Sequence, residues 1–164
     1  MFEAGKVVVY GSRGVYRVLN DVQMDIAGQK ICYHALQPLY SSNSTVYVPI
    51  DNDALISKIR PTLSKKQLES VIKAAEIGDL VWIDNDNLRR TRFKELLSLG
   101  DIEVTLGLIK LLKSKKQELT LAGKRLRQSD ERHLADALHP ITEEMQFAAE
   151  LSREQAEELV NSLM

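Results

Sequence analysis

The sequence predicts an α+β fold, in which a small, bent antiparallel β-sheet or barrel-like domain is followed by an all-helical domain. Two observations carry this prediction. Short runs of β-branched and aromatic residues, separated by Gly-, Ser- and Asn-rich turns, fill residues 1–50 of the 164-residue chain. From residue 63 onward, apolar residues recur with the 3.6-residue period of helices. Because the connections within the first half are short, its neighbouring strands must run antiparallel.

Four strand-like runs make up the first half of the chain. They cover residues 6–10, 14–24, 30–39 and 45–50, and the turns between them contain GSRG, DIAGQ and SSNS. Four or five short strands of this kind are typical of a small sheet or barrel. Pro49 has no N–H group to donate to a ladder, so we expect it at a sheet edge or at the end of its strand.

The GSRG tetrad at residues 11–14 is either a phosphate-binding loop or a tight corner. A P-loop needs a strand, then GxxxxGK[ST], then a helix. Here another strand-like run follows, and the sequence contains no GK[ST]. The pattern therefore favours a corner in which Gly11 and Gly14 supply positive φ angles.

Helix-start signals organise the second half. Capping boxes at Ser64–Gln67 and Ser152–Gln155 mark the starts of the first and last helices. Between them, the pattern predicts a helix over about 87–99 and another over about 102–118, with Asp101 as the N-cap of the latter.

A further helix is expected to start at Ser129, and Pro140 is expected to kink it or to start a new one. The boundary between the two halves falls near residues 51–62. We therefore expect a β domain over 1–55 and a helical domain over 63–164.

The net charge of −1 hides two segments of opposite sign. Residues 88–132 carry twelve Lys/Arg and six Asp/Glu, whereas residues 133–164 carry one Arg and seven Asp/Glu. Because local charge decides where a polyanion binds, a neutral total does not exclude nucleic acid as a partner.

The same bulk features argue against several classes of protein. No run approaches the roughly 20 apolar residues that a membrane span needs, and no signal peptide is evident. Cys32 is the only cysteine, which excludes an internal disulfide and a Cys-cluster zinc site. These features are typical of a cytoplasmic protein without metal or other cofactor and without a membrane partner.

Catalytic signals are sparse. Cys32 and His34 lie on one face of a strand, and a packed small residue beside a half-exposed histidine is the favoured interpretation over a nucleophile–base pair. Glu143 and Glu144 point about 100° apart on a helix and are interpreted as solvated. We predict no enzymatic activity, no catalytic residue and no metal site.

Basic residues form the main functional signal. They bunch at the start of the helix over 87–99 and around the junction before Ser129, where a helix–helix corner can bring them together. For any single cation a solvated helix face is the favoured interpretation; together they predict a phosphate-binding patch. The candidate residues from this clustering are Arg89, Arg90, Lys94, Lys124 and Arg125.

Trp82, the only tryptophan, precedes the first basic cluster. It is either a core residue of the helical domain, which the pattern favours, or an exposed aromatic wedge that presses against bases. The sequence leaves both interpretations open.

The order of these motifs resembles the CarD family of bacterial transcription regulators, most closely its Firmicutes-type members. The resemblance rests on the opening FEAGKVVVY…GV pattern, on VYVPID, on RRTRFKELLSLGD, on LIKLLKSKKQEL and on GKRLRQSDERHLADA, and it covers nearly the whole chain. In this resemblance, Arg132 matches a basic position at the head of the next long helix.

This resemblance implies a Tudor-like RNA-polymerase-interacting domain that docks on the polymerase β subunit by strand pairing. The residues that would supply the free strand are Ser44, Thr45, Val46, Tyr47, Val48 and Pro49. It also implies a helical domain that contacts promoter DNA at the upstream edge of the bubble without reading sequence, and so modulates open-complex stability. The protein is then expected to act as a monomer.

Two other functions remain open at this point. One is a protein-interaction adaptor whose basic face only aids solubility. The other is an RNA-binding small barrel on the ribosome, which the charge of +1 over residues 1–60 disfavours.

Overall fold

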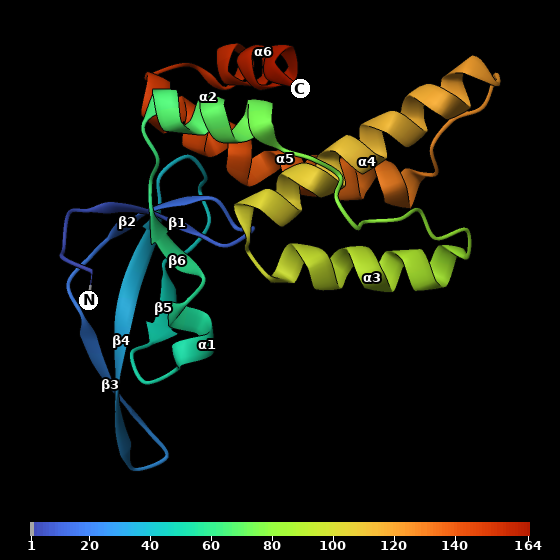
Figure 1. The fold of residues 1–164 in the computed structure, drawn as a ribbon. Helices are drawn as coiled ribbons and strands as arrows, with labels where there is room; N and C mark the ends of the chain where they lie inside the picture. Colours follow the sequence, from blue (N-terminus) through green and yellow to red (C-terminus); the bar gives the residue numbers. More distant parts are fainter. Residues whose placement is uncertain (1) are drawn as a thin grey trace.

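A six-stranded antiparallel sheet and a bundle of longer helices make up residues 2–164, the part of the chain that the computed structural model describes. The sheet and the helices lie side by side (Figure 1). This arrangement confirms the predicted α+β fold. Within residues 2–164, the helices are all too short or too polar to cross a membrane.

The sheet is built around one long strand. The elements of the first half are β1 (Val7–Tyr10), β2 (Val15–Val18), β3 (Val22–Ile26), β4 (Gln29–Pro38), β5 (Val46–Pro49), the short helix α1 (Asp53–Ile56) and β6 (Ile59–Pro61). Leu36 of β4 pairs with Val18 of β2 and with Val46 of β5, so β2 and β5 lie on opposite edges of β4. The other edge of β2 pairs with β1, and β1 pairs with β6.

The β part of the chain is longer than the expected 1–55. The residues of β6 fall within the predicted boundary between the two halves, residues 51–62. In the structure they belong to the sheet, because Tyr10 of β1 pairs with Ile59 and Val8 with Pro61. A three-residue strand is too short to show an alternating pattern, and its partner lies about 50 positions earlier in the sequence. Its role in the sheet is therefore visible only in the tertiary structure.

The GSRG tetrad is a corner between two antiparallel strands, as predicted. Gly11 and Gly14 have φ angles of 51° and 118°, which side chains rarely allow. The Tyr10 N–H donates to the Gly14 carbonyl at 2.9 Å, and the Arg13 N–H donates to the Tyr10 carbonyl at 2.9 Å. The backbone N–H groups of this turn are thus partly used within the turn itself.

The second half contains five helices: α2 (Lys65–Ala74), α3 (Asp86–Ser98), α4 (Ile102–Leu121), α5 (Gln128–Ala149) and α6 (Arg153–Leu163). Both predicted capping boxes are present, and Asp101 caps α4. Helix α3 begins at Asp86, because the Asn85 side chain accepts hydrogen bonds from the Asn87 and Leu88 N–H groups. Helix α5 begins before Ser129, and the residue at its N-cap position, Arg127, makes no side-chain capping bond.

Pro140 does not start a new helix, which corrects one of the two expected outcomes. The helix continues from Gln128 to Ala149 with Pro140 buried inside it. The proline removes one backbone hydrogen bond, but packing on several sides holds the helix together. Helix α5 contacts α2, α3, α4, α6 and strand β2.

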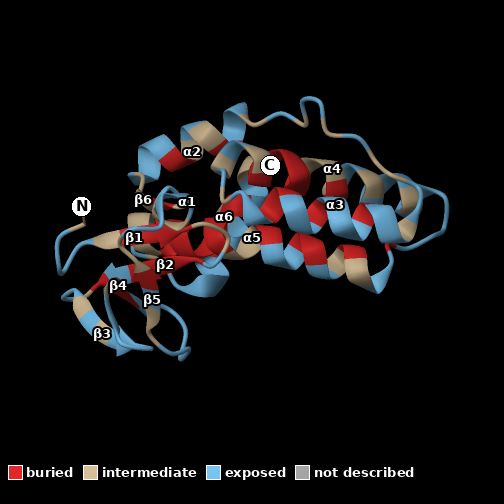
Figure 2. Ribbon diagram, turned by 90° about the horizontal axis from the view of Figure 1, so that it is seen from below, coloured by how far each residue is buried: buried red, intermediate tan, exposed pale blue. Residues whose placement is uncertain are grey.

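Two hydrophobic cores lie on either side of the joint between the halves. The sheet core contains Leu36, Val18 and Val48, and the helical core contains Phe93, Leu108 and Met145 among others. Figure 2 shows buried segments on the inner faces of the helices and on β1 and β2, with exposed segments at the far ends.

Glu144 joins the two halves and is fully buried, so the interpretation of this residue as solvated was wrong. Its carboxylate accepts two hydrogen bonds from the Arg60 guanidinium of β6, at 2.7 and 2.5 Å, and one from the Leu63 N–H at 2.8 Å. The sequence pattern of α5 could not reveal this role, since the partners lie more than 80 positions earlier.

Glu143 makes a second tie and is also buried, again contrary to expectation. Its Oε2 accepts a hydrogen bond from the Val15 N–H at 2.8 Å, directly after the GSRG corner. A Cβ at Gly14 would lie 2.0 Å from this same oxygen and would displace the carboxylate, and the φ angle of 118° also disfavours any side chain. The corner is therefore pressed against α5, and the sheet has a defined orientation relative to the helices.

Candidate functional site

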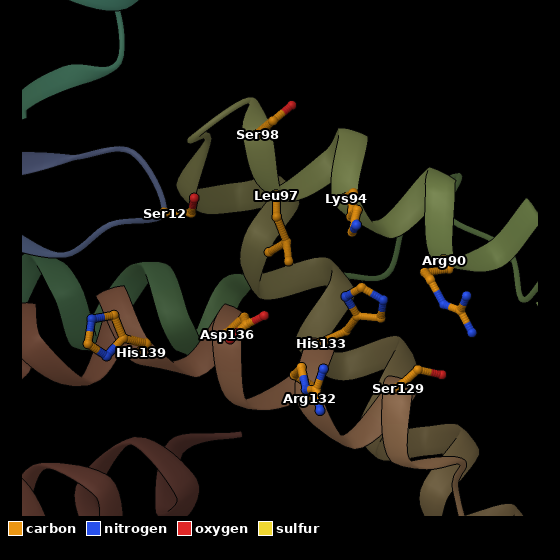
Figure 3. Close-up of a pocket in the computed structure, with 10 residues that line it drawn as sticks. All are labelled: Ser12, Arg90, Lys94, Leu97, Ser98, Ser129, Arg132, His133, Asp136 and His139. Carbon is orange, nitrogen blue, oxygen red and sulfur yellow. The ribbon is translucent and has the colours of Figure 1, made fainter. Parts of the chain in front are cut away.

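A cleft of about 450 Å³ runs between α3 and α5 and ends at the β1–β2 corner (Figure 3). Its walls combine cationic, hydroxyl and imidazole groups with a single carboxylate. The residues that line it are Ser12, Arg90, Lys94, Leu97, Ser98, Ser129, Arg132, His133, Asp136 and His139. This composition suits an anionic ligand rather than an apolar one.

Three cations in this cleft have no carboxylate partner within the described part of the chain. Arg90 and Lys94 come from successive turns of α3, and Arg132 comes from the first turns of α5. All three are exposed. The structure therefore brings together three of the residues that were predicted to contact phosphates.

Arg89 does not belong to this group, which corrects the sequence-based prediction. It is almost fully buried, 3% exposed, and its guanidinium donates two hydrogen bonds to the Asp130 carboxylate at 2.9 and 2.8 Å. It also donates to the Ile83 carbonyl and to Asp86, each at 2.8 Å. The hydrogen bonds to Asp130 raise the pKa of Arg89 above its ordinary value.

The physical reason is that neighbouring helical residues point about 100° apart. Phe93, four positions after Arg89, is buried, so Arg89 lies on the buried side of α3 while Arg90 turns toward the cleft. Since Asp130 belongs to α5, the Arg89–Asp130 pair holds the two walls of the cleft at a set distance. Arg89 is thus a positioning residue.

Trp82 is partly buried and packs against the helical core, as the favoured interpretation expected, and its role as a wedge stays a prediction. Its ring meets Phe93 edge to face at 6.0 Å between centroids, and the Arg89 guanidinium lies 4.4 Å from the ring centroid. The Lys115 ammonium lies 5.4 Å from the same centroid. These contacts hold the ring against side chains of α3 and α4.

An exposed apolar side chain does stand at the start of α3, but it is Leu88, which is 63% exposed. Sequence reasoning missed it, because a leucine in an amphipathic pattern is predicted to face the core. Ser12 and Ser98 were missed as well, since only the fold brings the β1–β2 corner to the end of α3.

Lys124 and Arg125 lie outside the cleft, in the connection between α4 and α5. Both are exposed and neither has a carboxylate partner among the described residues. Nearby cations are engaged within the chain: Lys116 pairs with Glu131 at 3.1 Å and Arg127 with Asp86 at 3.1 Å.

The acidic C-terminal segment does not cover the cleft. Helix α6 packs on α5 and α2, on the side away from α3 (Figure 1), and none of its residues lines the cleft. The positive charge between α3 and α5 is therefore not neutralised by the negative charge of residues 150–164.

His133 is a buried residue in the wall of the cleft, and its pKa is lowered. Burial lowers the pKa of His133, with Lys94 and Arg90 acting in the same direction and Asp130 and Asp136 in the opposite one. Its ring meets Phe93 edge to face at 5.6 Å. The folded protein thus favours the neutral imidazole at this position.

This shift predicts a loss of stability in acid. Above the unfolded pKa of about 6.5, His133 is neutral in both states and contributes no pH dependence. As pH falls through 6.5 toward the lower folded pKa, the unfolded chain takes up the proton first, and the free energy of unfolding decreases. We expect His133→Gln to reduce this decrease, measured as the difference in urea stability between pH 7.5 and 5.5. An equal decrease in both proteins would contradict the assignment.

The second candidate surface is the outer edge of β5. Among the strands of residues 2–164, β3, β5 and β6 each pair with one strand only. The Ile50 N–H donates to the Cys32 carbonyl at 3.0 Å, which identifies residues 50, 48 and 46 as those whose backbone groups face β4. The backbone groups of Thr45, Tyr47 and Pro49 therefore face outward.

The side chains of this strand support an exposed edge. Tyr47 is 45% exposed and meets Tyr33 edge to face at 6.5 Å, whereas Val48 is buried in the sheet core. Ser44 and Thr45 precede the strand. Since Pro49 has no N–H, the outward donors of the edge are the N–H groups of Thr45 and Tyr47.

These observations define a two-part protein: a small bent sheet with an open strand edge, held rigidly against a helical bundle that carries a cationic cleft. Residues 2–60 match the family model of the CarD-like/TRCF RID domain. The N-terminal part of this chain is thus a CarD-like RNA-polymerase-interacting domain, and the protein has an RNA-polymerase-binding role in transcription. The match ends one residue before the end of β6, in agreement with the extent of the sheet. The comparison with curated proteins finds no match to the chain.

Proposed function

We propose that this protein regulates transcription by bridging the RNA polymerase β subunit and promoter DNA. The outer edge of β5 pairs with a strand of the β subunit, and the α3–α5 cleft holds the duplex near the upstream edge of the bubble. The protein acts as a single copy beside the polymerase, in the cytoplasm, and modulates the stability of the open complex.

The observation that carries this proposal is the set of unpaired cations in the cleft: Arg90, Lys94 and Arg132. Three phosphate contacts alone give only weak, sequence-independent affinity, with Kd values on the order of 10⁻⁴–10⁻⁶ M at physiological salt. Docking on polymerase raises the local concentration of DNA toward the millimolar range. A weak DNA contact is therefore sufficient once the sheet is bound.

The proposed DNA contact predicts that removing the three cations together weakens DNA binding and abolishes the effect on the open complex. In Arg90→Ala/Lys94→Ala/Arg132→Ala, the slope of log K against log salt for a DNA duplex falls by about 2.7, since each phosphate contact contributes about 0.9. With purified polymerase, the open-complex lifetime returns to the value seen without the protein. Both quantities are measured with the full chain.

A matched control removes three exposed cations from α2, Lys65, Lys66 and Lys73, and we expect it to leave both quantities unchanged. If the cleft variant binds polymerase and still alters the open-complex lifetime as the parent protein does, the proposed DNA contact is wrong. The protein would then be an adaptor without DNA contact.

The proposed strand pairing with polymerase predicts that the outward N–H group of Tyr47 contributes more to polymerase affinity than its side chain does. Tyr47→Pro removes this donor and places a ring at the edge, while the ladder bonds to β4 remain. We expect about tenfold weaker binding to polymerase, because one lost hydrogen bond and a steric conflict amount to about 1.4 kcal/mol. Binding is measured by biolayer interferometry.

Tyr47→Thr is the control, because it keeps the N–H group and introduces a β-branched side chain that suits a strand. We expect it to bind polymerase several-fold more tightly than the proline variant. Equal affinity for the two variants would mean that β5 does not pair with the polymerase through its backbone.

A further inference from the structure

A second cleft, of about 210 Å³, lies on the sheet side of the domain joint. It is formed by the β1–β2 corner, by α1 and the residues just after it, and by the end of α3. Ser12 and Ser98 line both this cleft and the α3–α5 cleft. The two clefts therefore adjoin at these serines on either side of the joint, and we call the pair the joint groove.

The sheet side of the joint groove is cationic. Its charged residues are Arg13, in the GSRG corner, and Lys58, just before β6, and no carboxylate lines it. Neither cation has a carboxylate within 4 Å among the described residues. Arg13 is exposed and lies 5.6 Å from the centroid of the Tyr10 ring.

The corner that carries Arg13 has a defined position relative to the helices. Val15 is tied to Glu143 of α5, and the Arg13 carbonyl lies 3.2 Å from Nε2 of His139. On the other side, the Gly11 N–H donates to the Lys58 carbonyl at 2.8 Å. A Cβ at Gly100 would lie 2.7 Å from the Gly11 Cα, so the corner also touches the α3–α4 turn closely.

We propose that the nucleic-acid site extends across the domain joint, so that Arg13 and Lys58 contact backbone phosphates of the same duplex that Arg90, Lys94 and Arg132 hold. This extension rests on the proposed function of the α3–α5 cleft. The GSRG tetrad is a structural corner and at the same time presents a phosphate-contacting side chain.

The dimensions suit a duplex. Arg90 and Ser98 are separated by about 12 Å along the helix axis, at 1.5 Å per residue, and Arg13 lines the second cleft together with Ser98. Each strand of duplex DNA carries one charge per about 3.4 Å of the helix axis, so a backbone that follows the joint groove offers phosphates to cations from both domains. Ser12 and Ser98 add hydroxyl groups at the crossing point, and such contacts position a duplex without reading its sequence.

This site depends on both halves of the chain being held together. The cations from the sheet and from the helices face one duplex only while Glu143 and Glu144 keep the halves in register. The sheet therefore contributes to DNA contact in addition to its polymerase edge, which lies on a different strand.

The test measures binding of the full chain, without polymerase, to a mixed-sequence 20-base-pair duplex by fluorescence anisotropy between 50 and 200 mM NaCl. For Arg13→Ser/Lys58→Ser, we expect about tenfold weaker binding at 100 mM salt and a salt slope lower by about 1.8, at 0.9 per lost contact. The control Lys6→Ser/Lys30→Ser removes two exposed cations from elsewhere in the sheet and is expected to bind like the parent.

A variant with an added positive charge shows whether binding follows the charge of the groove, since a folding defect would not tighten binding. Ser12→Lys adds a cation where the two clefts meet, and we expect tighter binding with a slope higher by about 0.9. If the Arg13/Lys58 variant and Ser12→Lys both bind like the parent while the Arg90/Lys94/Arg132 variant loses binding, the extension is wrong and the proposed function stands. If the parent does not bind the duplex at 50 mM salt, the proposed DNA contact and this extension both fall.

Discussion

Replacing Arg89 with alanine is expected to lower the free energy of unfolding by about 3–5 kcal/mol, the range typical of breaking a buried ion pair from one side. The substitution leaves the Asp130 carboxylate, which is 3% exposed, without its cation inside the helical domain. It also leaves the Ile83 carbonyl without its donor and removes the guanidinium that covers Trp82. The measurement is urea unfolding at pH 7.5, followed by circular dichroism.

Arg90 is the matched control, because it is the same residue type one position later on the same helix. It is exposed and unpaired among the described residues, so Arg90→Ala is expected to change stability by less than about 0.5 kcal/mol. The two substitutions should therefore have different effects: Arg89→Ala lowers stability, and Arg90→Ala lowers DNA affinity. A loss below about 1 kcal/mol for Arg89→Ala would show that Asp130 does not depend on this pair.

Replacing Glu144 with alanine is expected to lower the free energy of unfolding by about 3 kcal/mol. The variant loses the two hydrogen bonds from Arg60 and leaves the Leu63 N–H without an acceptor. The expected loss lies at the lower end of the range for buried pairs, because Arg60 is 27% exposed and water can solvate part of its charge. The measurement is again urea unfolding.

The control for Glu144 is Glu157→Ala. Glu157 accepts a hydrogen bond from Arg153 at 3.0 Å, but both side chains are exposed, so the pair is expected to contribute less than about 1 kcal/mol. Because Glu144 also ties the sheet to α5, its replacement should weaken DNA binding through the joint groove. If Glu144→Ala were no more destabilising than Glu157→Ala, the joint would not depend on this carboxylate.

These two predictions concern residues whose role is to hold functional groups in place. Arg89 sets the spacing of α3 and α5, and Glu144 sets the orientation of the sheet. Neither faces the proposed ligand. A screen by activity alone would therefore place both residues in the binding site, and the stability measurement distinguishes the two explanations.

Local patterns predicted the elements well wherever neighbours in sequence are also neighbours in space. The capping boxes at Ser64 and Ser152 and the cap at Asp101 depend only on residues within three positions, and all are present. The antiparallel order of the first strands followed from the short turns, and Gly14 indeed has a positive φ angle.

The same reasoning was wrong where a residue's partner lies far away in the sequence. Glu143 and Glu144 looked solvated because their partners, Val15 and Arg60, lie in the sheet. Strand β6 was missed because its partner, β1, opens the chain. Arg89 looked like a phosphate ligand because Asp130 lies 41 positions away.

The amino-acid sequence alone determined the α+β fold, the polymerase-interacting nature of the first 60 residues and the separation of a basic segment from an acidic one. Periodicity, turn chemistry and charge are local properties, and they suffice for the fold class and the charge separation, whereas the nature of the first 60 residues follows from their match to the family model. Only the tertiary structure decided which of two adjacent arginines faces solvent, because a turn of 100° per residue matters only relative to the core that the helix covers. It likewise decided that the β1–β2 corner meets the end of α3, which depends on buried carboxylates paired across the joint.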